Sequence, residues 1–126
     1  MKKLILFTLL FVVTTISFAQ STLKMTSSTL LIFVDEDKEV FDLKPEIDIY
    51  LTDENLIIFS GKTQTFTFVG ESLEGDMDNI PYISCYATDQ NDKVCYITLF
   101  TPENDDWILN ISFIDYELYY SVKVQP

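Results

Sequence analysis

The sequence predicts an all-β fold, a single antiparallel meander of about eight strands that is closed as a small barrel or folded as a sandwich. After residue 20, apolar residues alternate with polar ones, and they nowhere show the three-and-four spacing of a helix over about eleven residues. β-Branched and aromatic residues, which favour strands, are abundant in the same region. Short clusters of turn-forming residues separate the apolar segments.

The first 19 residues have the pattern of a secretory signal peptide. Two lysines precede a long apolar run, and Ser17-Phe18-Ala19 gives a small-x-small cleavage site. Cleavage after Ala19 leaves one domain over residues 20–126, and 126 − 19 = 107 residues is a typical domain size. We therefore expect a periplasmic or secreted protein. Because a lipoprotein needs a cysteine directly after the cleavage site, and the first cysteine is Cys85, we expect no lipid anchor.

In the first half of the domain, each strand ends at a recognisable turn. The acidic turn 35–38 separates the first two strands, and Pro45 is expected to end the second, because proline cannot donate to a strand ladder. Thr52–Asn55 and Gly61 supply the next two turns. The predicted strands are residues 30–34, 40–43, 47–51, 56–60 and 64–69.

The second half begins with the polar stretch 70–79, which holds two of the three glycines and is expected to be a surface loop. No later apolar run approaches the roughly 20 residues that span a bilayer, so we expect no membrane insertion. The predicted strands here are residues 80–88, 93–100, 107–113 and 118–124.

Two hairpins can be given a register by matching their inward residues. The pairs are Leu51 with Leu56, Ile49 with Ile58, and residues 107, 109, 111 and 113 with 124, 122, 120 and 118.

Cys85 and Cys95 are the only cysteines, and the predicted secretion would place them in an oxidising compartment. A three-residue loop, Asp89–Asn91 with Asn91 left-handed, would set the two cysteines directly opposite each other. We therefore expect a cross-strand disulfide that contributes about 2 to 3 kcal/mol. The alternative is two unpaired thiols. A redox role is not indicated, because the spacing is not CxxC.

Charge and missing residue types exclude several functions. Residues 20–126 hold all 20 Asp and Glu and six of the eight lysines, so their formal charge is 6 − 20 = −14. The chain has no His and no Arg, which excludes histidine-based catalysis, His-ligated metals and bidentate Arg recognition of phosphate. The negative charge disfavours nucleic acid and anionic membranes. It favours solubility or a cationic protein partner.

Carboxylates are the abundant reactive groups, and most lie in predicted turns. We therefore expect no enzyme, with two-carboxylate hydrolysis as a remote alternative. Calcium suits acidic oxygens, and Asp76 and Asp78 are the best candidates for its ligands. However, the pattern of a calcium-binding EF-hand loop fails, because no glycine stands at its sixth position and no glutamate at its twelfth, so we expect a flexible acidic loop without metal or cofactor.

Tyr82, Tyr86 and Tyr96 alternate with the inward residues of their hairpin and lie on its opposite face. In a closed barrel, one face can line a cavity for a small apolar ligand. Such a face can also form a surface patch for a partner, or pack under loops. These three tyrosines are the ligand-binding candidates.

The first strand of the cysteine hairpin has the pattern Tyr82-x-Ser84-Cys85-Tyr86-x-x-Asp89, and the second strand contains Val94-Cys95-Tyr96-Ile97. The chain also starts with MKK and has FAQ at the cleavage site. In these features it resembles short secreted all-β proteins of Gram-negative bacteria, a family of unknown function. Its barrel would be lipocalin-like, but the early Gly-x-Trp of lipocalins is missing, since the only tryptophan is Trp107. The chain is also similar to small periplasmic lysozyme inhibitors in being an acidic, disulfide-bonded β-barrel, but no motif residue carries over from them.

Together these observations predict a non-enzymatic periplasmic or secreted binding protein that holds a small apolar ligand or a partner segment. The alternative is an acidic inhibitor or immunity protein that binds a cationic secreted enzyme.

Overall fold

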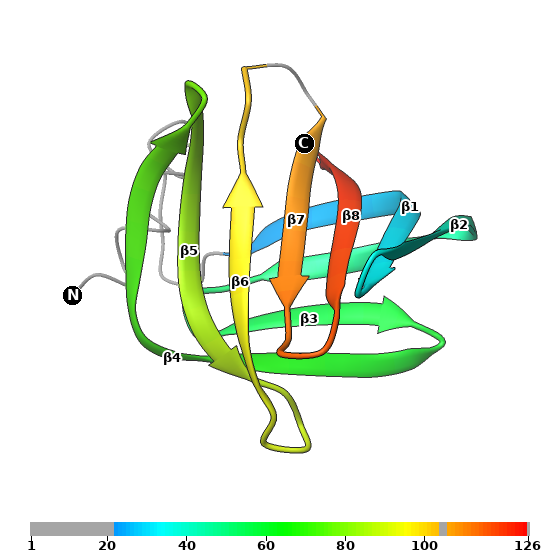
Figure 1. The fold of residues 1–126 in the computed structure, drawn as a ribbon, viewed down its shortest axis with the longest axis horizontal. Coiled ribbons are helices and arrows are strands. Elements are labelled where there is room, and N and C mark those ends of the chain that lie inside the picture. Colours follow the sequence, from blue (N-terminus) through cyan, green and yellow to red (C-terminus); the bar gives the residue numbers. More distant parts are fainter. Residues whose placement is uncertain (1–21, 104–105, 126) are drawn as a thin grey trace.

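The computed structural model describes residues 22–103 and 106–125, which form eight antiparallel strands (Figure 1). Each strand pairs with the next along the chain, and the last pairs with the first, so the sheet is a closed barrel. The all-β prediction is confirmed. Of the two predicted architectures, barrel and sandwich, the chain forms the barrel. The strands are β1 (Leu23–Val34), β2 (Asp37–Leu51), β3 (Asn55–Ser60), β4 (Lys62–Met77), β5 (Ile80–Thr88), β6 (Val94–Phe100), β7 (Trp107–Ser112) and β8 (Glu117–Val124).

The predicted signal peptide, residues 1–19, lies outside the described residues. In the part of the chain that the structure does describe, no helix is long and apolar enough to cross a membrane.

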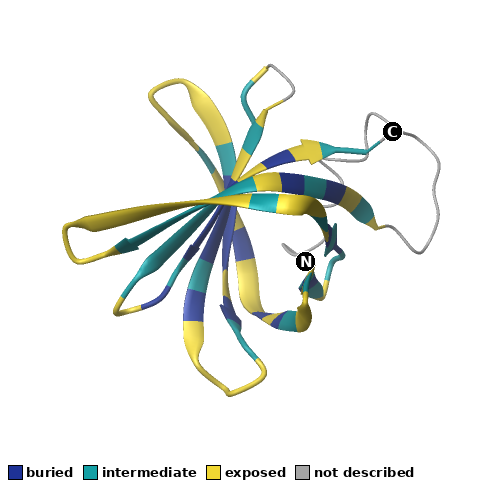
Figure 2. Cartoon of the chain, turned by 90° about the vertical axis from the view of Figure 1, so that its right-hand side faces the viewer, coloured by how far each residue is buried: buried dark blue, intermediate teal, exposed yellow. Residues whose placement is uncertain are grey.

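The middle of the barrel is filled by apolar side chains from every strand. An eight-stranded barrel is just wide enough for this, and each fully buried aliphatic or aromatic side chain contributes roughly 1.5 to 3 kcal/mol. Figure 2 shows the buried segments meeting at the centre and the exposed ones at the hairpin ends. The side chains with least exposure include Met25, Ile49, Leu56, Ile58, Phe66, Leu109, Ile111 and Val122.

The β2–β3 register is confirmed, since Leu51 lies opposite Leu56 and Ile49 opposite Ile58. The turn between them is held locally. The Thr52 hydroxyl accepts hydrogen bonds from the backbone N–H groups of Asn55 at 2.9 Å and of Glu54 at 3.2 Å. A hydroxyl that accepts backbone N–H groups in this way favours a turn, so Thr52 helps to fix the length of this loop.

The β7–β8 register is offset by two residues from the prediction. The loop is Phe113–Tyr116, closed by the Phe113 N–H donating to the Tyr116 carbonyl at 2.8 Å. A two-residue offset keeps every inward residue inward, so the faces are as predicted. The observed inward pairs are Trp107 with Val122, Leu109 with Tyr120, and Ile111 with Leu118.

The predicted loop 70–79 is wrong, because β4 runs through most of it to Met77. The strand accommodates Gly70 at φ 80°, where the pairing with β5 is irregular. The chain reverses only at Asp78 and Asn79, which have φ 53° and 68°. Asp and Asn tolerate this left-handed conformation, so two residues are enough for the turn.

Pro45 does not end a strand, because β2 continues to Leu51. It does mark a break in the ladder with β1. Asp42 pairs with Thr29 and Ile47 pairs with Ser27, so the four residues between Asp42 and Ile47 have no β1 partner. This irregularity separates a long outer part of β2 from the short part that reaches β3.

The turn of the cysteine hairpin has five residues rather than three. Thr88 pairs with Val94, which leaves Asp89–Lys93 as the loop, and the left-handed residue is Asp92 at φ 63°. The Asp89 carboxylate accepts the backbone N–H groups of Asn91 at 2.8 Å and of Lys93 at 2.9 Å. These two bonds hold the wider loop closed.

As a result, Cys85 lies opposite Ile97, and Cys95 lies opposite Ala87. The predicted direct opposition of the cysteines is therefore wrong. Both are buried on the interior face, and no disulfide joins them. Diagonal positions on neighbouring strands are roughly 7 to 8 Å apart, a spacing that a disulfide does not bridge without backbone movement.

Candidate functional site

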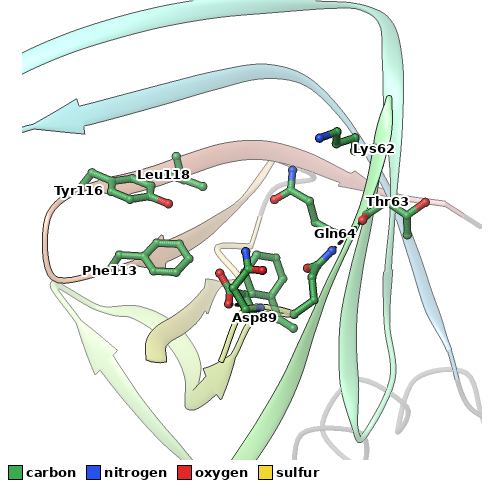
Figure 3. A pocket seen from close by; sticks show the side chains of 10 residues that line it. Lys62, Thr63, Gln64, Asp89, Phe113, Tyr116 and Leu118 are labelled. Carbon is green, nitrogen blue, oxygen red and sulfur yellow. Dashed lines mark hydrogen bonds between the residues drawn. The ribbon is translucent and has the colours of Figure 1, made fainter. Parts of the chain in front are cut away.

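One end of the barrel is hollow. The β3–β4, β5–β6 and β7–β8 turns surround a cavity of about 420 Å³, hereafter the mouth pocket (Figure 3). This volume is within the range of sites for small molecules, roughly 300 to 1,000 Å³. The lining residues are Lys62, Thr63, Gln64, Phe66, Asp89, Gln90, Asn91, Phe113, Tyr116 and Leu118.

An aromatic pair forms one wall of the mouth pocket. The rings of Phe113 and Tyr116 are stacked, with centroids 4.8 Å apart and planes at 20°. Phe113 also contacts the buried ring of Phe66, whose centroid is 6.4 Å away. The Lys93 ammonium lies 5.5 Å from the Phe113 centroid and 5.8 Å from that of Tyr116, close enough for a cation–π interaction. The wall is thus fixed both from the core and from the β5–β6 turn.

Opposite this wall, Gln90 ties two elements together. Its amide nitrogen donates to the Thr63 carbonyl and its amide oxygen accepts the Thr65 N–H, both at 3.0 Å. At this end β4 extends past β5, since the last β4–β5 pair is Thr67 with Thr88. The Gln90 side chain therefore continues the ladder where β5 has ended, and satisfies backbone groups that need partners.

Asp89 is the carboxylate among the lining residues, and its hydrogen bonds stabilise the β5–β6 turn. Besides its two backbone hydrogen bonds, its negative charge acts on Cys95. Burial, and secondly the charge of Asp89, raise the pKa of the Cys95 thiol to about 11. The thiol is therefore protonated at neutral pH and is a poor nucleophile.

The mouth pocket is less negative than the chain as a whole, because its one lining carboxylate, Asp89, is balanced by a lysine. Lys62 lines it, and Lys93 covers its aromatic wall. These are two of the six lysines in the described residues. Figure 3 shows the Phe113 and Tyr116 side chains facing Lys62 and Gln64 across the pocket. The arrangement offers one stacking surface, amide groups and an ammonium group, a set suited to binding and orienting a compact ligand.

A deeper cavity in the barrel is much smaller. This second cavity, lined by Leu51, Phe68, Ile83 and other core residues, holds about 20 Å³ and is apolar. That is about the space of one water molecule, and an apolar site of this size stays empty of water. Of these two cavities, only the mouth pocket has room for a small molecule.

The three candidate tyrosines lie on the outer wall of the barrel, apart from the mouth pocket. Tyr86 and Tyr96 are directly opposite, with ring centroids 4.7 Å apart in an edge-to-face contact. The Tyr96 hydroxyl shares a hydrogen bond of 2.6 Å with the buried Ser84 hydroxyl. Tyr82 packs edge-on against Phe100, with centroids 5.8 Å apart. Tyr86 is 59% exposed, so the cluster is a surface patch.

Asp76 lies near the end of β4, and Asp78 in the turn that follows it. Over residues 22–103 and 106–125, no group of three or more His, Cys, Asp or Glu side chains could hold a metal ion.

The mouth pocket was not predicted from the sequence. Its residues come from three turns and from the strand ends beside them, which are far apart along the chain, and they form no motif. A partial indication is the sequence Phe113-Ile114-Asp115-Tyr116, in which the two aromatic residues flank a turn. Three comparisons, with protein-family models, curated proteins and solved structures, found no match for the chain.

Proposed function

We propose that this chain is a non-enzymatic binding protein of the periplasm or the extracellular space, and that its mouth pocket holds a small ligand with a flat apolar part. The observation that carries the proposal is the stacked pair Phe113–Tyr116, which faces polar groups across a cavity of about 420 Å³. The apolar part would stack on the pair, and the polar groups would set its orientation.

The pocket is already organised for binding. Gln90 holds the end of β4, and Asp89 holds the β5–β6 turn, each through two hydrogen bonds to backbone groups. The Phe113–Tyr116 turn is closed by its own backbone hydrogen bond. A site whose loops are fixed before binding loses little conformational freedom when the ligand arrives, which favours affinity.

Catalysis has less support than binding. The chain contains no histidine, and the one carboxylate of the pocket, Asp89, already accepts two backbone N–H groups. A pair of carboxylates of the kind that glycoside hydrolysis needs is not among the lining residues.

The test measures binding of 8-anilinonaphthalene-1-sulfonate, an aromatic anion, by fluorescence titration. Phe113→Leu and Tyr116→Ala should each weaken binding by about tenfold, which is ~1.4 kcal/mol. Tyr86→Ala is the matched control, because Tyr86 is an exposed ring on the outer wall, and it should leave the affinity within about twofold. Equal effects of Tyr86→Ala and Tyr116→Ala would contradict the pocket as the site.

Two further measurements address the natural ligand and the location. Native mass spectrometry of protein isolated from its own cells should show a mass above that of the polypeptide, which denaturation removes. Denatured protein from the periplasm or the medium should have a mass corresponding to a chain that starts at Gln20. Recovery of the uncleaved chain from the cytoplasm alone would contradict the proposed location.

A further inference from the structure

The outer part of β2 has a strand neighbour on one side only. Residues Asp37–Asp42 pair with β1, whereas β2 pairs with β3 only through Asp48–Leu51. Within the described residues, the other edge of Asp37–Asp42 faces no strand. In Figure 1, β2 and β3 diverge toward the right, away from the region where they pair. The barrel thus carries an open edge, hereafter the β2 edge (Asp37–Asp42).

The turn of this hairpin shows which backbone groups face outward. Asp37 pairs with Val34 across two turn residues, so this pair exchanges hydrogen bonds with each other. In an antiparallel ladder, bonded and non-bonded pairs alternate. The N–H and C=O groups of Lys38, Val40 and Asp42 therefore point away from β1. They are placed to pair with an added strand.

Two large apolar side chains lie on the β2 edge. Val40 is 57% exposed and Phe41 is 40% exposed, and adjacent positions in a strand point to opposite faces of the sheet. All six residues of the edge are exposed. An extended segment bound here would form backbone hydrogen bonds and would cover apolar surface on both faces. This is how strand addition recognises a peptide.

The negative charge around the β2 edge indicates which kind of segment can bind there. Residues 35–46 contain six acids and two lysines, so their net charge is 2 − 6 = −4. A second copy would bring another segment of net charge −4 to this edge, in a chain that is itself strongly negative. A basic segment meets attraction instead of repulsion, and electrostatic attraction also speeds encounter.

We propose that the β2 edge accepts an extended, lysine- or arginine-bearing segment of a partner protein as an additional strand. This inference is independent of the mouth pocket, because no residue of Asp37–Asp42 lines that pocket. Strand addition of this kind would let an acidic inhibitor or immunity protein engage a cationic partner through backbone hydrogen bonds and charge together.

The experiment uses a fluorescein-labelled peptide, acetyl-Lys-Thr-Val-Lys-Val-Thr-Lys-amide, and measures binding to the purified protein by anisotropy. Val40→Pro removes an outward N–H without removing a bond to β1, so the hairpin should remain folded and the affinity should fall by about tenfold or more. Val40→Thr is the matched control. It keeps the N–H and should retain the affinity within about twofold.

Three further readouts decide between explanations. The same peptide with Glu in place of Lys should not bind, and binding of the Lys peptide should weaken at about 1 M NaCl, where charges are screened beyond ~3 Å. Hydrogen exchange should show that the Lys peptide protects the amides of Lys38, Val40 and Asp42 in wild-type protein. This measurement keeps the test valid even if Val40→Pro proves unstable.

The proposal is overturned if the Lys peptide does not bind, if a folded Val40→Pro binds it as tightly as wild type, or if the Glu peptide binds equally well. A wild-type dimer that Val40→Pro abolishes would assign the β2 edge to a second copy, and would equally overturn the assignment to a basic partner. Loss of 8-anilinonaphthalene-1-sulfonate binding in Tyr116→Ala, with peptide binding intact, would separate the two sites.

Discussion

Asp89 links the shape of the β5–β6 turn to the chemistry of Cys95. Its carboxylate accepts the N–H groups of Asn91 and Lys93, which fixes a five-residue loop and shifts the cysteines out of opposition. Its charge adds to burial in raising the pKa of the Cys95 thiol to about 11. One side chain thus favours a protonated, buried thiol over a disulfide.

The first prediction concerns thiol reactivity. In folded, unreduced protein at neutral pH, neither Cys85 nor Cys95 should react with 5,5′-dithiobis(2-nitrobenzoate) on the timescale of minutes, because both side chains are buried and Cys95 is protonated. After unfolding in guanidinium chloride without reductant, both thiols should titrate. Finding none in the unfolded, unreduced protein would establish the disulfide that the structure lacks.

Alkaline pH should destabilise the fold. Burial, and secondly Asp89, raise the pKa of Cys95 from 9.0 to about 11, so the thiol ionises in the unfolded chain before it ionises in the folded one. This stabilisation is complete below pH 9.0 and is lost as the pH rises to about 11. Two pKa units correspond to about 2 to 3 kcal/mol.

Denaturant unfolding at a series of pH values measures the effect. Cys95→Ala should be less stable near neutral pH, because it leaves a small void, but its stability should fall less steeply between pH 9 and about 11 than that of wild type. Above pH 10.0 Tyr120 adds to the loss, because burial, and secondly Tyr116, raise the pKa of its hydroxyl to about 12. Parallel curves for wild type and Cys95→Ala would contradict the role of Cys95.

At the scale of elements, Gln90 substitutes for a missing piece of strand. Gln90→Ala removes both hydrogen bonds to β4, so the Thr63 carbonyl and the Thr65 N–H would hydrogen-bond to water instead. We expect a loss of about 1 kcal/mol in the free energy of unfolding, together with faster exchange of the Thr65 amide. Asn91→Ala is the control, because it leaves both bonds in place. A Thr65 amide equally protected in both variants would contradict this role.

Alternation in the sequence predicts which face of a strand is buried, but it does not predict the register. A shift of two residues keeps every inward side chain inward, so the pattern cannot distinguish the two alignments. The β2–β3 register was predicted correctly by matching inward residues across a four-residue loop, and in the structure the local residue Thr52 holds that turn. The other two hairpins depend on Asp89 and on the stacking of Phe113 with Tyr116, which alternation does not reveal.

The candidate site lies beyond sequence reasoning for a related reason. Residues on one strand face can be assigned from their spacing, which is why Tyr86 was predicted to lie on the face opposite to the cysteines. The mouth pocket instead depends on three turns meeting at one end of a closed barrel. Their proximity follows only when closure and every register are known. The β2 edge was not predicted either, because Pro45 was expected to end the strand, whereas β2 continues to Leu51.

At the scale of the whole molecule, the acids are distributed over strands as well as turns. Several lie along the exposed parts of β2 and β4, so the negative charge covers the sides of the barrel and not only its rim. The ion pair recorded among the described residues, Lys123 with Asp106 at 3.9 Å, has both side chains mostly exposed. Such pairs contribute little, about 0 to 1 kcal/mol. Since the formal net charge of the chain is −12, we expect repulsion among carboxylates to dominate its long-range electrostatics.

The last prediction follows from this balance. Because the formal net charge is −12 over the whole chain, salt should screen more repulsion than attraction and stabilise the folded state. Raising NaCl from about 0.01 M to 0.1 M shortens the screening length from ~30 Å to ~10 Å. A gain of about 1 kcal/mol would raise Tm by roughly 4 to 8 °C for a domain of this size.

Thermal unfolding followed by circular dichroism measures this effect, with Asp37→Asn/Asp42→Asn as the comparison. Neutralising two acids of the β2 edge removes part of the repulsion in advance, so the variant should have a higher Tm at low salt and a smaller gain on adding NaCl. The same variant should bind the basic peptide more weakly, because the charge that destabilises the free protein is the charge that attracts the partner. A Tm that falls with salt in wild type would show that attractive pairs dominate, and would remove the electrostatic reason for assigning the β2 edge to a basic segment.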